Sequence, residues 1–346
     1  MSAETSNMVL DGAIAPQENT RLFGHDEAQA FLAQSYRAGK SHHAILIEGP
    51  EGIGKATLAF RFAQHVLSHP VPGEAPAEVH DPDPQSPVFR QVAAGASHNL
   101  LHITRPVDPK TGKAKSGITV DEVRRAGRFF GQTSGGDGWR IVVVDTADDL
   151  NRNAANAILK MLEEPPKRSM FLVLSHAPGR LLPTIRSRCL PLRLRPLADD
   201  DLRRALDHLG LPVPADKADR VMPLSGGSVA QAIKLINYGG FDVMEAFAEV
   251  LKQQGPVQRK AIHKLADAVA QRDNDTLYAF FCDLVMQHVA EAARQAAVEG
   301  RTQHAFDLSQ LHAGLAEQFG VADAYNLERK QTIIGILAEV AARTAN

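Results

Sequence analysis

The sequence predicts an α/β domain built on a parallel sheet with flanking helices, followed by an all-α C-terminal region. Short apolar runs without polar alternation recur in the first 196 residues, which is typical of strands buried on both faces. A glycine-rich loop follows the first of these runs and precedes a helical pattern. After Pro196 the strand pattern stops, and apolar residues recur at helical spacing.

Five apolar runs are the expected strands, at residues 44–48, 100–103, 140–144, 171–174 and 190–194. Because Pro191 has no N–H to donate to a ladder, the last run is expected at an edge of the sheet or at the entry to a loop. Between the first two runs, residues 70–90 are Pro-rich and acidic, which predicts a loop or an insertion.

The length of 346 residues allows two or three domains at about 150 residues each. Stripes of apolar residues, such as Leu277 with Phe281 and Ile333 with Leu337, predict helices near the C-terminus. The expected division is a flexible tail at 1–20, a nucleotide-fold domain at 21–196, a small helical lid at 197–243 and a C-terminal helical domain at 244–346.

Composition excludes several classes of protein. The net charge is −2 and aromatic residues make up 5%, which argues against a protein that coats nucleic acid through bulk charge or an aromatic platform. The two cysteines, Cys189 and Cys282, cannot by themselves form a disulfide framework or a four-ligand zinc site, and free thiols fit a reducing cytoplasm. A signal-peptide pattern and a long apolar stretch are both missing, so we expect a cytoplasmic chain without a membrane partner.

The glycine-rich loop at residues 49–57 reads GPEGIGKAT and nearly matches the phosphate-binding pattern G-x-x-x-x-G-K-[ST]. Gly49, Gly52 and Gly54 let backbone N–H groups approach phosphate oxygens, and Lys55 is placed for the β- and γ-phosphates. The alternative is a glycine-rich turn without a ligand.

Two positions of this expected nucleotide site lack a functional group. Ala56 stands where a hydroxyl would bind Mg²⁺, and Thr57 is one residue too late to replace it, although it can touch a phosphate. Asp145 ends the third run and fits a metal-holding carboxylate, or else a helix N-cap, and Thr146 after it is no general base. We therefore expect weak binding of ATP or ADP, no metal site and little hydrolysis.

Three motifs carry a resemblance to a known family: NAILK at 156–160, LEEPP at 162–166 and SRC at 187–189. In this order after a phosphate loop, they resemble the clamp-loader branch of the AAA+ ATPases, over the whole chain after about residue 20. The resemblance implies a AAA+ domain, a helical lid and a C-terminal collar domain. Ala56, Thr146 and Ala230, which stands where motor subunits have a sensor arginine, make it similar to a non-hydrolysing member.

The resemblance also implies roles and partners. Arg188 would act as an arginine finger in the ATP site of an adjacent subunit, and Ser175 fits the polar sensor position after the fourth strand. Glu163 and Glu164 would form a structural turn. The partners implied are the gamma/tau motor subunits, the delta subunit, a sliding clamp and primer–template DNA held through the assembly. Many relatives carry a four-cysteine zinc module, but residues 67–101 contain no cysteine, so no zinc is expected.

Two alternatives stay open at this point. Intact Lys55 and Asp145 favour a self-sufficient gamma/tau-like ATPase motor, which Ala56, Thr146 and Ala230 oppose. The second alternative is a pure scaffold, which neither binds nucleotide nor donates an arginine.

Overall fold

Five parallel strands form one sheet in the order β2-β3-β4-β1-β5. All five predicted runs are strands, and the prediction of a parallel sheet is confirmed. β4 begins two residues before its predicted run, and β5 lies at the edge of the sheet, where the missing N–H of Pro191 is tolerated. The strands are β1 Ala44–Glu48, β2 Leu100–Ile103, β3 Arg140–Val144, β4 Ser169–Ser175 and β5 Leu190–Arg193.

The computed structural model describes residues 9–108, 114–115, 117–131, 138–213, 215–271, 274–325 and 327–344. Contacts divide the chain into two compact units, Met1–Ala232 and Ile233–Asn346. This boundary lies within the predicted lid at 197–243, and the division into a tail and three domains stays a prediction.

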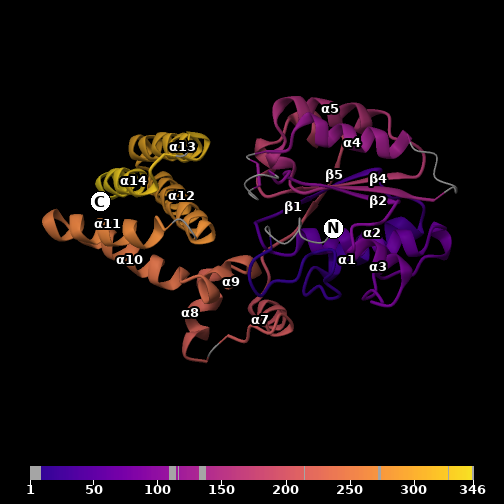
Figure 1. The fold of residues 1–346 in the computed structure, drawn as a ribbon, viewed down its shortest axis with the longest axis horizontal. Coiled ribbons are helices and arrows are strands. Elements are labelled where there is room, and N and C mark those ends of the chain that lie inside the picture. The colour runs from indigo at the N-terminus through magenta and orange to yellow at the C-terminus, as the bar shows by residue number, and fades with distance from the viewer. Residues whose placement is uncertain are drawn as a thin grey trace. The chain divides into compact units, whose positions relative to one another are not determined.

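Helices cover both faces of the sheet in the first unit (Figure 1). Ile45 and Ile47 of β1 pack in one core cluster with Leu58, whereas Ala44 and Leu46 pack in another with helical residues of the opposite face. Both faces of β1 are therefore buried, which explains why its sequence shows no polar alternation. The covering helices are α1 Asp26–Arg37, α2 Lys55–Ser68 and α3 Pro87–Ala93 on one side, and α4 Val120–Gly131 and α5 Arg152–Glu163 on the other.

The Pro-rich segment at 70–90 contains more regular structure than a loop. A 3-10 turn spans Pro72–Glu74, and α3 already begins at Pro87. The Ser86 hydroxyl accepts a hydrogen bond from the backbone N–H of Phe89 at 3.2 Å, and Pro87 occupies the first helical position, where no N–H donor is needed. These capping residues start a helix inside a segment whose composition indicates a loop.

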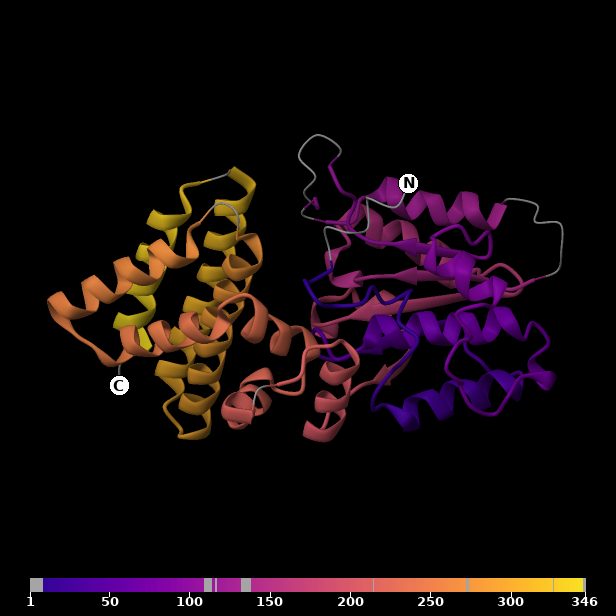
Figure 2. The same cartoon turned by 60° about the horizontal axis from the view of Figure 1, so that its bottom comes forward.

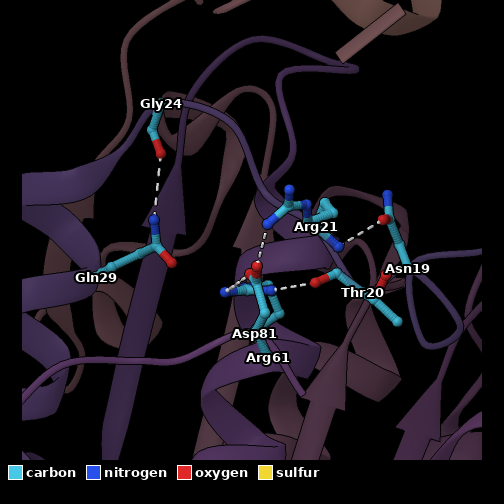
Figure 3. Close-up of polar contacts among 7 residues, drawn as sticks. All are labelled: Asn19, Thr20, Arg21, Gly24, Gln29, Arg61 and Asp81. Atoms are coloured by element: carbon cyan, nitrogen blue, oxygen red, sulfur yellow. Dashed lines mark hydrogen bonds and ion pairs between the residues drawn. The ribbon is translucent and has the colours of Figure 1, made fainter. Parts of the chain in front are cut away.

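The carboxylate of Asp81 links this segment to α2 and to the N-terminal residues 19–21 (Figure 3). Arg61 is 4% exposed; its guanidinium donates to the Thr20 carbonyl at 2.7 Å and pairs with Asp81 at 2.8 Å. Asp81 also accepts a hydrogen bond from Arg21 at 2.5 Å. Burial alone would raise the pKa of Asp81, but Arg21 and Arg61 outweigh it and lower the pKa, so the buried cation is matched by an ionised partner.

The first unit also contains the short α6 Pro183–Arg186, α7 Asp199–His208, α8 Ala215–Ser225 and the start of α9 Val229–Asn237. Two further 3-10 turns, Ala147–Asp149 and Pro178–Arg180, follow β3 and β4.

The second unit is helical, as predicted. In it α12 and α13 pack along each other (Figure 2), and Phe281, Ile333 and Leu337 from the predicted apolar stripes are fully buried in its core. No helix within the described ranges is long and apolar enough to cross a membrane. The helices are α10 Gly240–Lys252, α11 Gly255–Val269, α12 Asp275–Val298, α13 Thr302–Tyr325 and α14 Arg329–Thr344.

Candidate nucleotide site and arginine finger

The predicted phosphate loop connects the end of β1 to the first residue of α2, as the motif requires. Gly54 has φ +101° at the N-cap of α2. Gly52 has φ +74°, and a Cβ there would lie 2.4 Å from both the Ala230 Cβ and the Ser228 Oγ. Gly49 leaves room for the Leu194 carbonyl, which a Cβ would meet at 2.6 Å. The glycines therefore serve the packing of the loop as well as its backbone conformation.

Other parts of the first unit hold the loop through its carbonyl groups. The Ser228 hydroxyl donates to the Glu51 carbonyl at 2.8 Å, and the Val229 N–H donates to the Gly52 carbonyl at 2.9 Å. The His25 Nε2 lies 2.7 Å from the Ile53 carbonyl. The carbonyl groups of the loop are held by other residues, and its glycines have positive φ. Such a backbone suits a loop whose N–H groups form an anion-binding concavity.

Lys55 lies inside this site, 4% exposed, and donates from Nζ to the carbonyls of Gly49 at 2.7 Å and Pro50 at 2.5 Å. Burial lowers its pKa to about 8, although the carboxylates of Glu51, Asp145 and Asp148 act in the opposite direction. The lysine that the sequence predicts for phosphate binding is thus buried within the loop, and the charges of three carboxylates favour its ammonium form.

The donor groups fit a phosphate better than they fit Mg²⁺. Ala56, the second residue of α2, packs against the core and has no side-chain oxygen, and Thr57 follows it half-buried in the same helix. Across the part of the chain that the structure describes, no group of three His, Cys, Asp or Glu side chains is placed to hold a metal ion. In residues 67–101, the stretch without cysteine, the Nδ1 of His69 lies 2.9 Å from the His65 carbonyl, so this ring nitrogen is within hydrogen-bond distance of the backbone. The loop and Lys55 would hold a phosphate, whereas the hydroxyl ligand for magnesium is missing.

Asp145 directly follows β3, and Ser175 ends β4, the strand next to it in the sheet; the two side chains have different partners. The Asp145 Oδ2 lies 3.6 Å from the His102 Nε2. The fully buried Ser175 donates its hydroxyl to Asp148 at 2.9 Å, and Asp148 also accepts the N–H groups of His176 at 2.6 Å and Ala177 at 3.3 Å. The Ser175 hydroxyl, for which the sequence predicts a sensor position, is therefore bound to a carboxylate of its own chain.

Sequence reasoning did not identify Asp148 as a site residue. An acidic residue in a turn after a strand usually caps a helix or faces solvent, so its local sequence has no distinctive signal. Only the folded chain brings it to Ser175. Close to Asp148 in the chain, the Thr146 hydroxyl donates to Asp149 at 3.4 Å. The pKa of His176 is lowered, mainly by burial and then by the charge of Lys55.

Arg188 lies after α6, and its polar partners are outside the phosphate loop. Its Nη2 pairs with the Glu163 Oε1 at 2.7 Å and its Nη1 donates to the Thr184 carbonyl at 2.9 Å, while the side chain stays 34% exposed. Cys189 beside it is buried, and burial raises the pKa of its thiol to about 11, so it packs as a small apolar residue rather than acting as a thiolate.

Comparisons with known proteins agree with this architecture. Residues 24–198 match the family model described as DNA polymerase III, delta subunit. The chain is 34% identical over 264 residues to the DNA polymerase III subunit delta′ of Pseudomonas aeruginosa, covering 74% of each chain. It is 30% identical over 227 residues to the delta′ subunit of Escherichia coli K12, covering 65% of this chain and 64% of that one.

Two further similarities are more distant. The chain is 29% identical over 207 residues to the DNA polymerase III subunit tau of E. coli K12, covering 59% of this chain and 29% of that one. A solved structure of a DNA polymerase III gamma subunit-related protein from Thermotoga maritima is similar with a TM-score of 0.41 and 18% identity, covering 91% of this chain and 99% of that one. On the family model and the delta′ relatives, the chain belongs to the DNA polymerase III delta′ family.

Proposed function

We propose that this chain is the non-hydrolysing member of a clamp loader and donates Arg188 to the ATP site of an adjacent motor subunit. One observation carries the proposal: the guanidinium of Arg188 is fixed at the surface by its own chain, while the chain's own nucleotide site lacks groups that hydrolysis needs. Similarity to delta′ and tau subunits supports the same assignment.

Three features oppose hydrolysis in the chain's own site. Ala56 supplies no oxygen to magnesium, and Thr146 supplies no carboxylate to a water molecule. The Ser175 hydroxyl is bound to Asp148. Because phosphoryl transfer depends on positioning and on charge stabilisation, losing these groups together removes most of the catalytic advantage.

The chemistry proposed for Arg188 takes place on ATP held by the neighbour. Water attacks the γ-phosphorus and releases a proton to solvent, the bond between the γ-phosphorus and the β–γ bridging oxygen breaks, and ADP and phosphate leave. Negative charge shifts onto the bridging oxygen and the γ-oxygens, and a guanidinium supplied in trans stabilises it, an effect of about 10³–10⁵ in rate.

The remaining expectations belong to the same proposal. The partners would be tau/gamma motor subunits, a delta subunit and the sliding clamp, with primer–template DNA held by the whole assembly in the cytoplasm. The net charge of −2 supports contacts that are mainly with protein. ATP or ADP would occupy the degenerate loop weakly, and zinc would have no role.

Nucleotide binding by the isolated chain should be weak and nearly independent of Mg²⁺, because Ala56 offers no metal ligand. Phosphate is attracted by the charged form of Lys55, whose pKa is lowered to about 8. Affinity should therefore hold at neutral pH and fall by up to about tenfold for each pH unit above that pKa. Calorimetric titration with ADP, with and without magnesium, measures both effects; tight, magnesium-dependent binding would contradict the account of Ala56.

A self-sufficient ATPase motor is the second candidate, favoured by the buried Lys55 and by Asp145 at the end of β3. Steady-state ATP turnover separates the two. We expect no turnover by the chain alone, and a rise in turnover when it is added to motor subunits from the same genome. Turnover by the isolated chain that Lys55→Ala abolishes would establish the motor instead.

A further inference from the structure

We propose that Glu163 is a positioning residue that orients the guanidinium of Arg188 for the neighbouring ATP site. This inference rests on the proposed function, because it concerns the same arginine. Glu163 is the last residue of α5, and Arg188 follows the end of α6. The two helices pack on each other, which brings the carboxylate to the arginine.

The contacts fix the plane of the guanidinium and not only its position. Two different nitrogens are held by two different elements: Nη2 by the carboxylate of Glu163 at 2.7 Å and Nη1 by the carbonyl of Thr184 at 2.9 Å. A single contact would leave the planar group free to rotate about that contact. A guanidinium carries five N–H donors, so donors remain for phosphate oxygens.

Both supports of the guanidinium rest on buried structure. In α5, Leu162 is 1% exposed, and its carbonyl lies 3.0 Å from the His43 Nε2, next to the start of β1. In α6, Ile185 is 1% exposed and follows Thr184 directly. The residues next to Glu163 and Thr184 in the chain are therefore part of the core, which gives the arginine a defined place relative to the sheet.

The ion pair between Arg188 and Glu163 is too weak to matter much for the stability of the fold, which argues that it serves to orient the arginine. The side chains of Arg188 and Glu163 are 34% and 47% exposed, and ion pairs of this kind add little to folding because solvent screens them. The cation also lies by the C-terminal end of α5, where the partial negative charge of the helix favours it. An ordered arginine loses less side-chain freedom when it meets the transition state, so the benefit appears in the rate.

The test is ATP turnover of the full complex reconstituted with motor subunits from the same genome. We expect Glu163→Ala to lower kcat about three- to tenfold at the site that Arg188 faces, with KM for ATP unchanged, because ATP itself is bound by the motor subunit. Glu163→Gln keeps a hydrogen-bond acceptor for Nη2 and should restore most of the rate. Glu164→Ala, the exposed neighbouring carboxylate, is the matched control and should match the wild type.

Arg188→Ala in the same assay separates this inference from the proposed function. A large loss with Arg188→Ala together with an unchanged or raised kcat for Glu163→Ala would overturn the positioning role and leave the arginine finger intact. No loss with Arg188→Ala would overturn the proposed function and the positioning role together. A fall in kcat for Glu163→Gln as large as for Glu163→Ala, or a rise in KM, would also contradict orientation by a hydrogen bond.

Discussion

Replacing Arg188 with alanine is expected to lower ATP turnover of the reconstituted complex by about 10³-fold or more at the site that this arginine faces. The guanidinium would stabilise charge that develops on the γ-phosphoryl group, and alanine leaves that charge without a partner. The measurement is single-turnover hydrolysis with motor subunits from the same genome, with binding of the clamp and of DNA checked separately.

Two variants control for general loss of charge and for loss of geometry. Arg186→Ala removes an exposed arginine at the end of the same short helix and should leave the rate unchanged. Arg188→Lys keeps the charge but loses the planar two-point geometry, so it should recover only part of the rate. Equal, small effects of Arg186→Ala and Arg188→Ala would leave a scaffold as the function of the chain.

Replacing Gly52 with alanine should destabilise the N-terminal unit by about 3 kcal/mol, through steric overlap and backbone strain together. The new Cβ would lie 2.4 Å from the Ala230 Cβ and 2.9 Å from the Ala230 backbone nitrogen, and φ is +74°. Denaturant unfolding followed by the fluorescence of Trp139, the single tryptophan of the chain, reports on this unit.

Gly95 provides the matched control for this substitution. It has φ +63° but nothing within 4 Å of an added Cβ, so Gly95→Ala should cost only the backbone strain, about 1–2 kcal/mol. The difference between the two variants isolates the packing of residues 228–230 on the phosphate loop. Equal losses for Gly52→Ala and Gly95→Ala would show that this packing does not occur in solution.

The strands were predictable from sequence because both faces of the sheet are covered. Continuous burial produces the apolar runs of β1, β3 and β4, and all five predicted runs match strands within two residues. The expectation of burial on both faces is wrong for the edge strand β5, in which Pro191 and Arg193 are exposed. The first residue missed in β4 is Ser169, a polar residue at a buried strand start whose hydroxyl donates to the Pro166 carbonyl at 2.6 Å; nothing in the structure explains the omission of the apolar Met170. Hydrophobicity cannot identify a buried polar residue that is satisfied by a local hydrogen bond.

The site was predictable only where one stretch of chain carries the signal. The phosphate loop and the SRC motif are local patterns, and their residues lie where the patterns indicate, at the end of β1 and after α6. Asp148, Glu163 and Ser228 act through contacts with residues far away in the chain. Such pairings depend on tertiary packing, and no spacing in a single sequence indicates them.

The central claim is that this chain promotes hydrolysis in a neighbour's site and does not hydrolyse ATP in its own. The most direct test is single-turnover hydrolysis by a reconstituted complex in which the motor subunits lack their phosphate-loop lysines and this chain is wild type. We predict no ATP hydrolysis above background, because the only intact phosphate-loop lysine is then Lys55, in a site without the magnesium hydroxyl or a catalytic carboxylate. Hydrolysis that persists in this complex and disappears with Lys55→Ala would contradict the claim.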